Sequence, residues 1–507
     1  MAADAPDTRR SVYLLLTAVA VAIAVAKVVG AENVIEPSRY KAPISKDGTK
    51  GYGNEADREW PPTRPEPGAT FSSNDKSRFA TIRALVDDNT YVIGKRVLPH
   101  PTDAGKKFLD TGIIEKGKGY ESLDIVMNPA TNEFYSSKPP LMPTVLAGEY
   151  WLLKRVLGWD IVRDRFLVIP FIVFTVNVLP FAVYLVLLAR IIEGTAATDF
   201  GKLLAFTTAA IGTYLITFSG TLNNHSPAAF CVLFAAYPLL RAMQEKRDMT
   251  AWGYLGCGFF AAVATTCDLT AAAFLAGVGV PLLIARPRSA VLYFLPGALI
   301  PLAALFACNY AAMGSLLPAY SEFGGPWYNF EESHWAKRGK PGAKGIDFNT
   351  EPTPIYAFHL LLGHHGWFSL TPMWFLAAGG LLALGARSAG DIRKLFGKAS
   401  GTGWTPELFA AMTCVISVTV FAFYLTRTQS YNYGGNTSGP RWLFWLIPLW
   451  ALAVAPAADR LAGLKGGRVL CAVLLGFSVL SVFYPAANPW RHPWILNLME
   501  YVGFLRY

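Results

Sequence analysis

The sequence predicts an all-α polytopic membrane protein with about 11 transmembrane helices. Hydrophobic residues make up 53% of its 507 residues and charged residues only 16%, whereas roughly a quarter of an ordinary soluble protein is charged. Apolar runs of about 20 residues, long enough to cross a bilayer as helices, recur along the chain. Basic residues stand at alternate ends of these runs, which is the pattern that orients membrane helices.

Residues 1–31 are expected to form a short cytoplasmic tail and the first transmembrane helix. Arg9 and Arg10 precede an apolar stretch from about Val12 to Val29. A signal peptide is the alternative, but the run is long and no good small-residue cleavage site stands out. The two arginines predict that the N-terminus lies in the cytoplasm.

Residues 32–162 are polar and aromatic, and we expect them to form an exoplasmic loop with two amphipathic juxtamembrane helices. The first helix is indicated by apolar residues at helical spacing, namely Phe79, Ile82 and Val86. The second is indicated by the apolar run 141–157. The segment 89–134 between them is irregular, and its sequence is compatible with a lid or with a small β-element.

Charged residues stand at the beginning of both predicted helices. Ser73 or Asn74 is a suitable N-cap, which places Asp75 in the first helical turn. Arg78 follows three residues later and shares a helix face with Asp75. Lys138 precedes two prolines, which favour helix starts, so it would stand at the entrance of the second helix.

Residues 163–485 form the predicted multi-span domain. We expect spans near residues 164–190, 201–220, 225–243, 250–267, 269–285, 290–312, 366–386, 406–426, 442–457 and 468–485. The short turns between successive pairs of these spans are basic and fall on the side of the N-terminus. The outer face would then carry the first loop, the loop 313–365, the turn 431–440 and an exoplasmic tail, 486–507.

Two motifs in the first loop resemble a known family. Asp-x-x-Arg-Phe-Ala-x-Ile at residues 75–82 and Tyr-x-x-Lys-Pro-Pro-Leu at residues 135–141 are similar to the first exoplasmic loop of C-type (GT-C) membrane glycosyltransferases. They are most similar to the protein mannosyltransferase and lipid A aminoarabinose transferase branch. The resemblance implies a GT-C-like fold in a plasma (inner) membrane. It also implies inverting transfer of a sugar from a polyprenyl-phosphate donor to a glycan, lipid or protein acceptor on the exoplasmic face.

Such a reaction needs a carboxylate for the acceptor proton and cations for the leaving phosphate. The resemblance assigns the base to Asp75 and the phosphate clamp to Lys138, with Arg78 and Tyr135 as further substrate-binding residues. The alternatives are an ordinary ion pair between Asp75 and Arg78 and a Lys138 side chain that snorkels to the interface.

Three further residues are expected at the outer face. Arg441 begins a span from the outer side, against the usual charge bias. Placing a charged side chain there costs free energy, which suggests a functional reason for it. The resemblance assigns it to the phosphate, with Tyr433 of the same turn in the substrate site; an interfacial anchor is the alternative. Asp268 lies in a tight hairpin and is either a solvated turn residue or a second acid facing the cavity. His225 is expected to make a hydrogen bond at a helix start.

No cofactor and no metal site are expected, although a divalent metal stays open. His364 and His365 point apart on a helix and make a poor chelate by themselves; a site with His334, Glu331 and Glu332 is conceivable. The six cysteines lie in or beside apolar spans and resemble core residues. The formal charge of +10 fits contacts with membrane lipids better than nucleic acid, because the basic residues flank the spans.

Two other classes of function were weighed against transfer. A transporter or flippase of lipid-linked saccharides would usually show internal repeats and charges near mid-membrane, whereas here no half repeats the other and the charges lie at the outer ends. In a non-catalytic assembly subunit, Asp75 and Lys138 would be dispensable.

Overall fold

The computed structural model describes residues 6–32, 67–98, 107–337, 340, 345–348, 351–390, 401–428 and 432–505. Most of the first loop before residue 67, the segment 99–106, Tyr431 and the chain ends therefore lie outside the described residues. The helices are α1 (Asp7–Val29), α2 (Ser73–Arg83), α3 (Leu141–Leu157), α4 (Arg165–Val173), α5 (Leu179–Glu193), α6 (Asp199–Ile211), α7 (Tyr214–Thr217), α8 (His225–Gln244), α9 (Ala251–Cys267), α10 (Ala272–Ala285), α11 (Pro287–Ser289), α12 (Leu295–Met313), α13 (Thr353–Leu361), α14 (Trp367–Leu370), α15 (Met373–Gly385), α17 (Pro406–Leu425), α18 (Ile447–Ala462), α19 (Gly467–Phe483) and α20 (Trp494–Tyr501).

The apolar helices coincide with the predicted spans. Within the described ranges, seven helical segments are long and apolar enough to cross a membrane: Asp7–Val29, Arg165–Glu193, Asp199–Gly220, His225–Gln244, Pro287–Met313, Pro406–Leu425 and Arg441–Ala462. The other four predicted spans are shorter apolar helices, at Ala251–Cys267, Leu269–Ala285, Met373–Gly385 and Gly467–Phe483. The chain therefore has the helices of a multi-pass membrane protein, while the full count of spans stays a prediction.

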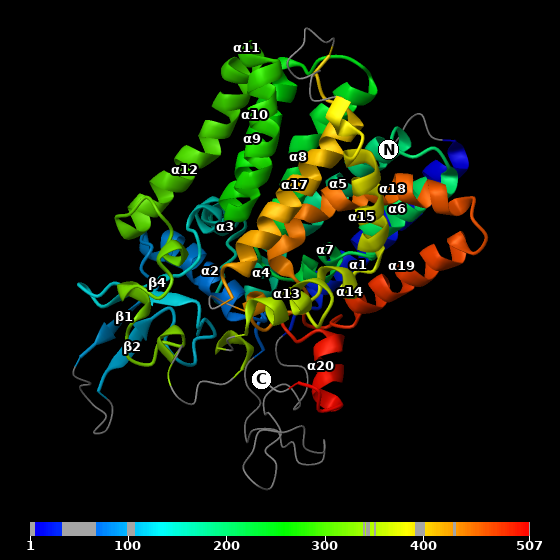
Figure 1. Ribbon diagram of the computed structural model, residues 1–507. Helices are drawn as coiled ribbons and strands as arrows, with labels where there is room; N and C mark the ends of the chain where they lie inside the picture. The colour runs from blue at the N-terminus through cyan, green and yellow to red at the C-terminus, as the bar shows by residue number, and fades with distance from the viewer. Residues whose placement is uncertain are drawn as a thin grey trace.

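The two ends of the bundle separate as the charge pattern predicts. Figure 1 shows the strands, α13 and α20 at one end, and α11 at the other, with the N-terminus in the half that contains α11. At the N-terminal end, Arg9 forms an ion pair of 2.5 Å with Glu193, at the end of α5. At the opposite end, Lys27 donates a hydrogen bond of 2.6 Å to the carbonyl of Ala486. The loops that we call outer thus share one end, and the compartment that this end faces stays a prediction.

Threonines begin three helices at the N-terminal end of the bundle. The side chains of Thr198, Thr250 and Thr405 accept hydrogen bonds from the first backbone amides of α6, α9 and α17. Threonine is favoured at this position because its hydroxyl satisfies an amide that the helix leaves unpaired. These caps fix where the chain re-enters the bundle after each basic turn.

The segment 89–134 is the main departure from the all-α prediction. It contributes three of the four strands of an antiparallel sheet of order β2-β1-β4-β3, so the small β-element was the better of the two alternatives. The strands are β1 (Gly94–Val97), β2 (Leu109–Gly112), β3 (Ile125–Met127) and β4 (Glu133–Ser136). Gly94 faces Gly112 in the register. A Cβ on Gly112 would lie 2.7 Å from the Gly94 Cα, so this pair needs glycine.

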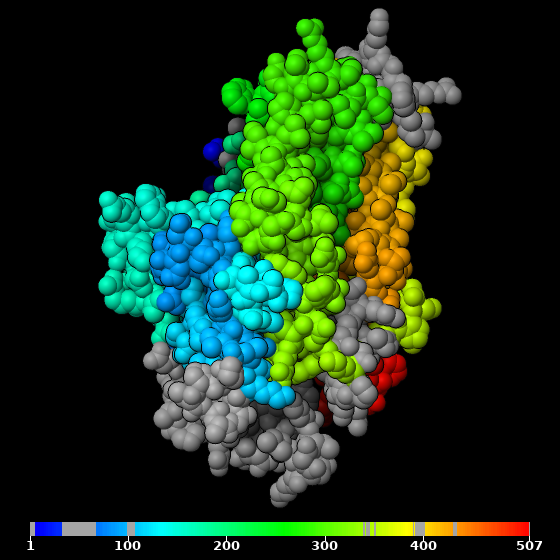
Figure 2. Space-filling model, turned by 90° about the vertical axis from the view of Figure 1, so that its left-hand side faces the viewer, coloured from blue at the N-terminus to red at the C-terminus, as the bar shows by residue number. Residues whose placement is uncertain are grey.

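The sheet packs against the segment that follows α12. Figure 2 shows the first loop, in blue to cyan, directly beside this yellow-green segment. The indole of Trp335 donates a hydrogen bond of 2.8 Å to the carbonyl of Leu123. Arg96 of β1 donates to the carbonyl of Glu331 over the same distance. Two outer loops that are far apart in sequence thus form one layer over the bundle.

This layer explains why α2 is not the amphipathic surface helix that the sequence predicts. Ser72 is the N-cap and accepts a 3.3 Å hydrogen bond from the Asp75 amide, one residue before the predicted caps. Both faces of α2 are buried: Phe79 packs in the core, and the hydroxyl of Ser77 donates 2.8 Å to the carbonyl of Asp124. By contrast, α3 has its predicted bounds and exposes an apolar side that includes Trp151, as a helix at a membrane surface would.

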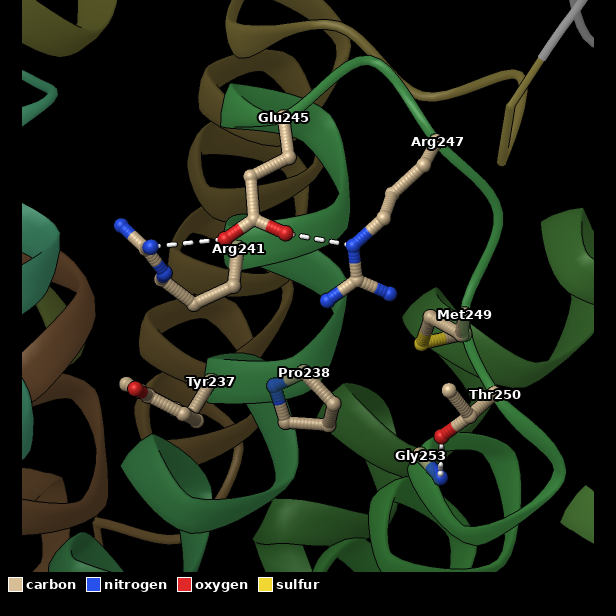
Figure 3. Close-up of a pocket in the computed structure, with 8 residues that line it drawn as sticks. All are labelled: Tyr237, Pro238, Arg241, Glu245, Arg247, Met249, Thr250 and Gly253. Carbon is tan, nitrogen blue, oxygen red and sulfur yellow. Dashed lines mark hydrogen bonds and ion pairs between the residues drawn. The ribbon is translucent and has the colours of Figure 1, made fainter.

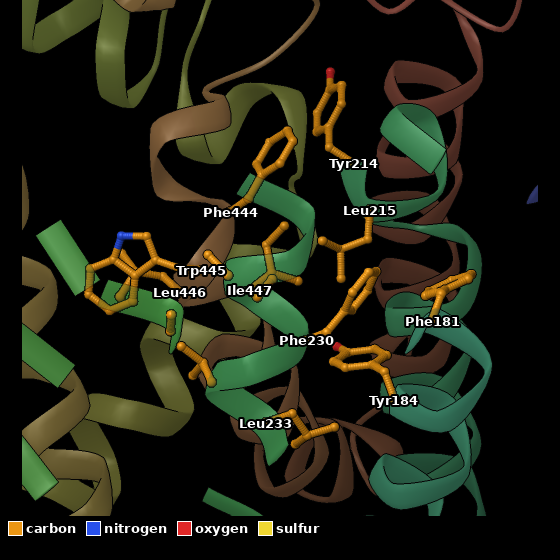
Figure 4. Packing of buried hydrophobic residues seen from close by; sticks show 14 of the residues in the cluster. Phe181, Tyr184, Tyr214, Leu215, Phe230, Leu233, Phe444, Trp445, Leu446 and Ile447 are labelled. Carbon is orange, nitrogen blue, oxygen red and sulfur yellow. The ribbon is translucent and has the colours of Figure 1, made fainter. Parts of the chain in front are cut away.

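Aromatic packing fixes the beginning of α18. Tyr184 of α5 lies 5.8 Å from Phe230 of α8, measured between ring centroids. Tyr214 of α7 stacks at 5.9 Å on Phe444, which belongs to the turn before α18. Figure 4 shows these side chains in one continuous cluster. Because cores of this kind resist displacement of single side chains, the turn that carries Arg441 is held firmly against α7 and α8.

Candidate active site

A cavity of about 710 Å³ opens between the first loop, the turn after α9, the outer loop after α12, α17 and the beginning of α18. Its wall combines charged and apolar parts. The charged side chains in its lining are Arg78, Asp124, Lys138, Asp268, Arg427 and Arg441. A largely apolar part is formed by Leu269, Ala273, Val420, Phe423 and Trp442.

Arg78 extends from α2 into the wall of this cavity. Its guanidinium donates to the side-chain oxygen of Asn74 and, over 2.7 Å, to that of Asn224. Its hydrogen-bond partners in the described part of the chain are thus amide oxygens rather than carboxylates. The side chain is 1% exposed, and this burial lowers the pKa of Arg78 to about 10. Desolvation of this kind disfavours the charged form.

Lys138 enters the same wall from the residues before α3. Its ammonium lies 2.7 Å from the carboxylate of Asp124, and the amide of Ser137 donates 3.0 Å to the carbonyl of the same aspartate. Burial lowers the pKa of Lys138, Asp124 raises it, and the positive charges of Arg78 and Arg441 lower it further. The three cations therefore lie close enough to influence one another.

Arg441 reaches the cavity from the late outer turn. One guanidinium nitrogen donates 2.8 Å to the carbonyl of Gly434, and another lies 3.5 Å from the Nε2 of His225. The guanidinium also lies 4.8 Å from the ring centroid of Trp490. It is buried, which argues against the interfacial anchor that was the alternative for this residue.

Counted together, these side chains give the wall an excess of positive charge. The lining contains four cationic side chains, those of Arg78, Lys138, Arg427 and Arg441, and two carboxylates, those of Asp124 and Asp268. Buried charges are costly unless they are paired. A cluster with more cations than carboxylates is therefore suited to an anionic ligand, and the apolar part of the cavity is suited to a hydrocarbon chain joined to it.

Asp268 is the cavity acid that the sequence left open. It follows α9, is 8% exposed and lines the cavity. Its carboxylate lies 2.7 Å from the Nδ1 of His225. His225 begins α8, as expected, and its amide donates a hydrogen bond of 2.9 Å to the Asn223 side chain. Its ring contacts Asp268 on one side and Arg441 on the other. The sequence pattern did not indicate these ring contacts.

Asp75 does not belong to the cavity lining. Its carboxylate accepts hydrogen bonds of 2.5 Å from Ser72, 2.7 Å from Thr221 and 3.4 Å from the Phe71 amide. The side chain is 1% exposed, and burial raises its pKa. The described structure contains no ion pair between Asp75 and Arg78. Asp75 thus ties α2 to the segment before α8, and its role as the base stays a prediction.

The two predicted tyrosines are also outside the lining. Tyr135 of β4 donates 3.2 Å to Glu133 and packs at 5.5 Å on Trp327. Tyr433 donates a hydrogen bond to the carboxylate of Glu351 and lies next to Gly434, whose carbonyl holds Arg441. Tyr433 therefore contacts the site through the backbone rather than directly.

Sequence reasoning missed Asp124, Asn224 and the ring contacts of His225. Asp124 belongs to the insertion 89–134, where no periodic pattern marks it. Asn224 directly precedes a helix, where the sequence pattern explains an asparagine as a turn residue and does not indicate its contact with Arg78. The contact of Arg78 with Asn224 joins residues 146 positions apart, and that of His225 with Asp268 joins residues 43 positions apart. Asp124 and Lys138 are only 14 positions apart.

A smaller cavity of about 270 Å³ lies at the N-terminal end of the bundle. Figure 3 shows Glu245 between Arg241 and Arg247, and Thr250 with its hydroxyl at the Gly253 amide, 3.1 Å away. The acid is satisfied by its two neighbours and the threonine caps α9. These contacts stabilise the turn between α8 and α9 and leave no group directed at a ligand.

No protein-family model and no curated protein matches the chain. Among solved structures, it is similar to the oligosaccharyltransferase AglB of the archaeon Archaeoglobus fulgidus in complex with an inhibitory peptide and a dolichol-phosphate (TM-score 0.45, 10% identity, 95% of this chain and 56% of that one). It is also similar to the apo form (TM-score 0.43, 10% identity, 94% and 56%). A third match is the form tethered to an acceptor peptide (TM-score 0.39, 10% identity, 94% and 54%). The chain thus spans little more than half the length of these proteins. The mannosyltransferase and aminoarabinose transferase branch is not among these three structures and stays a prediction.

Proposed function

We propose that the protein is a membrane glycosyltransferase that moves a sugar from a polyprenyl-phosphate donor to an acceptor at the outer end of the bundle. One observation carries the proposal. Three cations from distant parts of the chain, the buried Arg78 and Arg441 and the partly buried Lys138, meet on the wall of one cavity that continues into apolar surface. A lipid-linked phosphate has the matching chemistry, an anionic head on a hydrocarbon tail.

In this proposal the cations stabilise the phosphate as it leaves. Negative charge develops on the phosphate oxygens when the bond from the sugar breaks, and preorganised cations in a buried site stabilise that charge strongly. Lys138 acts as a point charge, and the planar guanidinium groups can bind two oxygens each. Asp124 holds Lys138 in place at 2.7 Å before the donor arrives.

The apolar wall accommodates the lipid. Leu269 lies just before α10 and Ala273 in its first turn, while Val420 and Phe423 come from α17. Burial of hydrocarbon surface contributes about 25 cal/mol per Å², so a polyprenyl chain along these side chains would add substantially to donor affinity. The same wall excludes water, which would otherwise compete with the acceptor.

The acceptor needs a carboxylate within hydrogen-bond reach of its hydroxyl. The family resemblance assigns this role to Asp75, whereas the cavity geometry favours Asp268, because Asp268 lines the cavity. We therefore propose that Asp268 takes the acceptor proton, with His225 at 2.7 Å orienting its carboxylate. The acceptor oxygen bonds to the anomeric carbon, the bond from that carbon to the phosphate oxygen breaks, and the lipid phosphate departs with the electron pair. Asp75 is then a positioning residue for α2.

A transfer assay tests the proposal. Purified protein is given radiolabelled polyprenyl-phosphate sugars, and transfer to a cell-envelope acceptor fraction is measured beside release of lipid phosphate. We expect Lys138→Ala and Arg441→Ala to abolish most transfer. Lys154→Ala is the matched control, because Lys154 lies in α3, the helix that follows Lys138, but pairs with Asp87 outside the cavity. Wild-type rates in both cavity variants, with an active parent, would refute the assignment. Uptake of labelled lipid without bond cleavage would indicate a flippase instead.

A further inference from the structure

A second cluster of chemically active side chains lies at the outer end, apart from the cavity. Glu351, His359 and His364 each offer one ligand atom, and these three atoms lie within 4.8 Å of one another. Glu351 precedes α13, His359 is in its last turn, and His364 follows it. None of the three lines the cavity. Two residues that the sequence suggested for a metal site with His364 and His365 make other contacts: His334 lies 3.2 Å from Asp347, and Glu331 lies 3.5 Å from Lys107.

The cluster contains a buried nitrogen that has no partner. His359 is 4% exposed, and its Nδ1 is shielded from solvent without a hydrogen-bond partner in the described structure. An unsatisfied buried polar atom costs about 1–3 kcal/mol, so it calls for an explanation such as an absent ion. His364 is buried as well, and imidazole binds metals in its neutral form.

The hydrogen bonds around His364 determine which of its nitrogens carries the lone pair. The Nε2 of His365 lies 3.1 Å from the carbonyl of Thr437, and a carbonyl can only accept, so this nitrogen carries the proton. The Nδ1 of a neutral His365 must then accept. It lies 2.6 Å from the Nδ1 of His364, which therefore donates. This leaves the lone pair on the Nε2 of His364, and the arrangement resembles the outer hydrogen bonds that orient metal-binding histidines.

The surroundings hold the other two side chains in place. Tyr433 donates its hydroxyl hydrogen to the carboxylate of Glu351, and its ring stacks on His365 with centroids 5.3 Å apart. Gly363 leaves room for His359, because a Cβ there would lie 2.3 Å from the His359 Nδ1. Side chains from the outer loop and the late turn thus converge on one small volume.

From this geometry we propose that Glu351, His359 and His364 form a binding site for Zn²⁺. Two imidazoles and one carboxylate are a ligand set that zinc accepts, whereas Mg²⁺ and Ca²⁺ prefer oxygen ligands throughout. Tetrahedral bonds of about 2.0–2.1 Å would bring the ligand atoms to roughly 3.4 Å from one another. Compared with the 4.8 Å limit that encloses them now, this requires only small side-chain movements.

The site would brace the turn that carries Arg441. Tyr433 holds Glu351, and the carbonyl of the next residue, Gly434, accepts the 2.8 Å hydrogen bond from Arg441. A bound zinc would therefore tie α13 to this turn. This consequence for Arg441 rests on the proposed function, but the metal site itself does not, since it shares no side chain with the cavity.

Metal content tests the site without any measurement of turnover. Full-length protein, purified in detergent with its affinity tag removed, is stripped with a chelator, dialysed against Zn²⁺ and then against metal-free buffer, and analysed by mass spectrometry. We expect about one zinc per chain in the parent, and at least a tenfold lower affinity in His359→Gln and Glu351→Gln. His334→Gln is the matched control, because this histidine of the same outer loop pairs with Asp347, and it should retain the parent's zinc.

Substitution with Co²⁺ provides a second measurement on the parent protein, in case a variant does not fold. Intense visible absorption of a four-coordinate cobalt ion that Zn²⁺ displaces would support the site. Less than about a tenth of an equivalent of zinc in the parent, or equal zinc in His359→Gln, Glu351→Gln and His334→Gln, would overturn it. A parent protein that binds no zinc in this test but still transfers sugar would end this inference and leave the proposed function standing.

Discussion

Replacement of Lys138 by alanine affects both its ion pair in the structure and the role in phosphate binding that we propose for it. The ammonium forms a largely buried ion pair with Asp124 at 2.7 Å, and Lys138 lines the cavity together with Arg78 and Arg441. Lys138→Ala therefore removes a cation from the phosphate site and leaves the Asp124 carboxylate, 6% exposed, without its ammonium.

The two effects have different magnitudes. Breaking a buried pair by removing one partner costs about 3–5 kcal/mol of folding stability. Because the positive charge of Arg78 also interacts with Asp124, we expect the lower end, about 3 kcal/mol. Loss of one donor to a developing anion lowers the catalytic rate by roughly 10²–10³-fold.

Asp124→Asn distinguishes these effects. This variant breaks the same ion pair but keeps the ammonium in the cavity, so we expect a loss of stability with turnover within about tenfold of the parent. The assay measures transfer at saturating donor and thermal unfolding in detergent for the parent, both single variants and Lys138→Ala/Asp124→Asn. Turnover of Lys138→Ala within threefold of the parent, at a temperature where it remains folded, would refute the phosphate role.

Three further predictions follow from the site. Asp268→Asn should lower turnover by about 10²–10⁴-fold with little change in donor affinity, whereas Asp75→Asn should keep most of its turnover. Single-turnover transfer and donor binding are measured for both variants. A larger loss of turnover in Asp75→Asn than in Asp268→Asn would return the role of the base to Asp75. Burial raises the pKa of Asp75 above its ordinary value of 3.8, so the folded state keeps a proton that the unfolded chain loses, and the free energy of unfolding should fall as the pH rises above 3.8. Asp75→Asn should flatten this decline in a series of thermal unfolding curves from about pH 4 to 8, and an unchanged slope would contradict it. Arg441→Lys keeps the charge but loses the planar group that contacts Gly434 and His225. The KM for the donor should therefore rise at least about tenfold. A KM equal to that of the parent would show that the positive charge alone suffices.

Local patterns predicted much of the helical architecture. The apolar run after Lys138 became α3 with the predicted bounds, Leu141–Leu157, and each predicted span coincides with an apolar helix. These features depend on hydrophobic length and helix signals, which are properties of short stretches of sequence. Lys138 and Arg441 were also expected at one site, because the family resemblance assigns both to the phosphate and the order of the spans places both at the outer end.

Contacts between distant segments could not be predicted in this way. The sheet that covers α2 arises from short strands in an irregular insertion. Asp75 is held by Thr221, which lies 146 positions further along the chain. The contacts of Asp268 with His225 and of Tyr433 with Glu351 depend on how separate helices and turns pack. Sequence spacing shows that such residues are near helix ends, but not which side chains then meet.

The central claim is that the outer cavity binds a lipid-linked phosphate between Arg78, Lys138 and Arg441. A cryo-electron microscopy structure of the protein with a polyprenyl phosphate tests it most directly. The account predicts density for the phosphate within about 4 Å of the Lys138 ammonium and the Arg441 guanidinium, with the hydrocarbon chain along Leu269 and Phe423. A phosphate bound at the N-terminal end of the bundle, or equal affinity for the polyprenyl phosphate and the uncharged polyprenol, would contradict it.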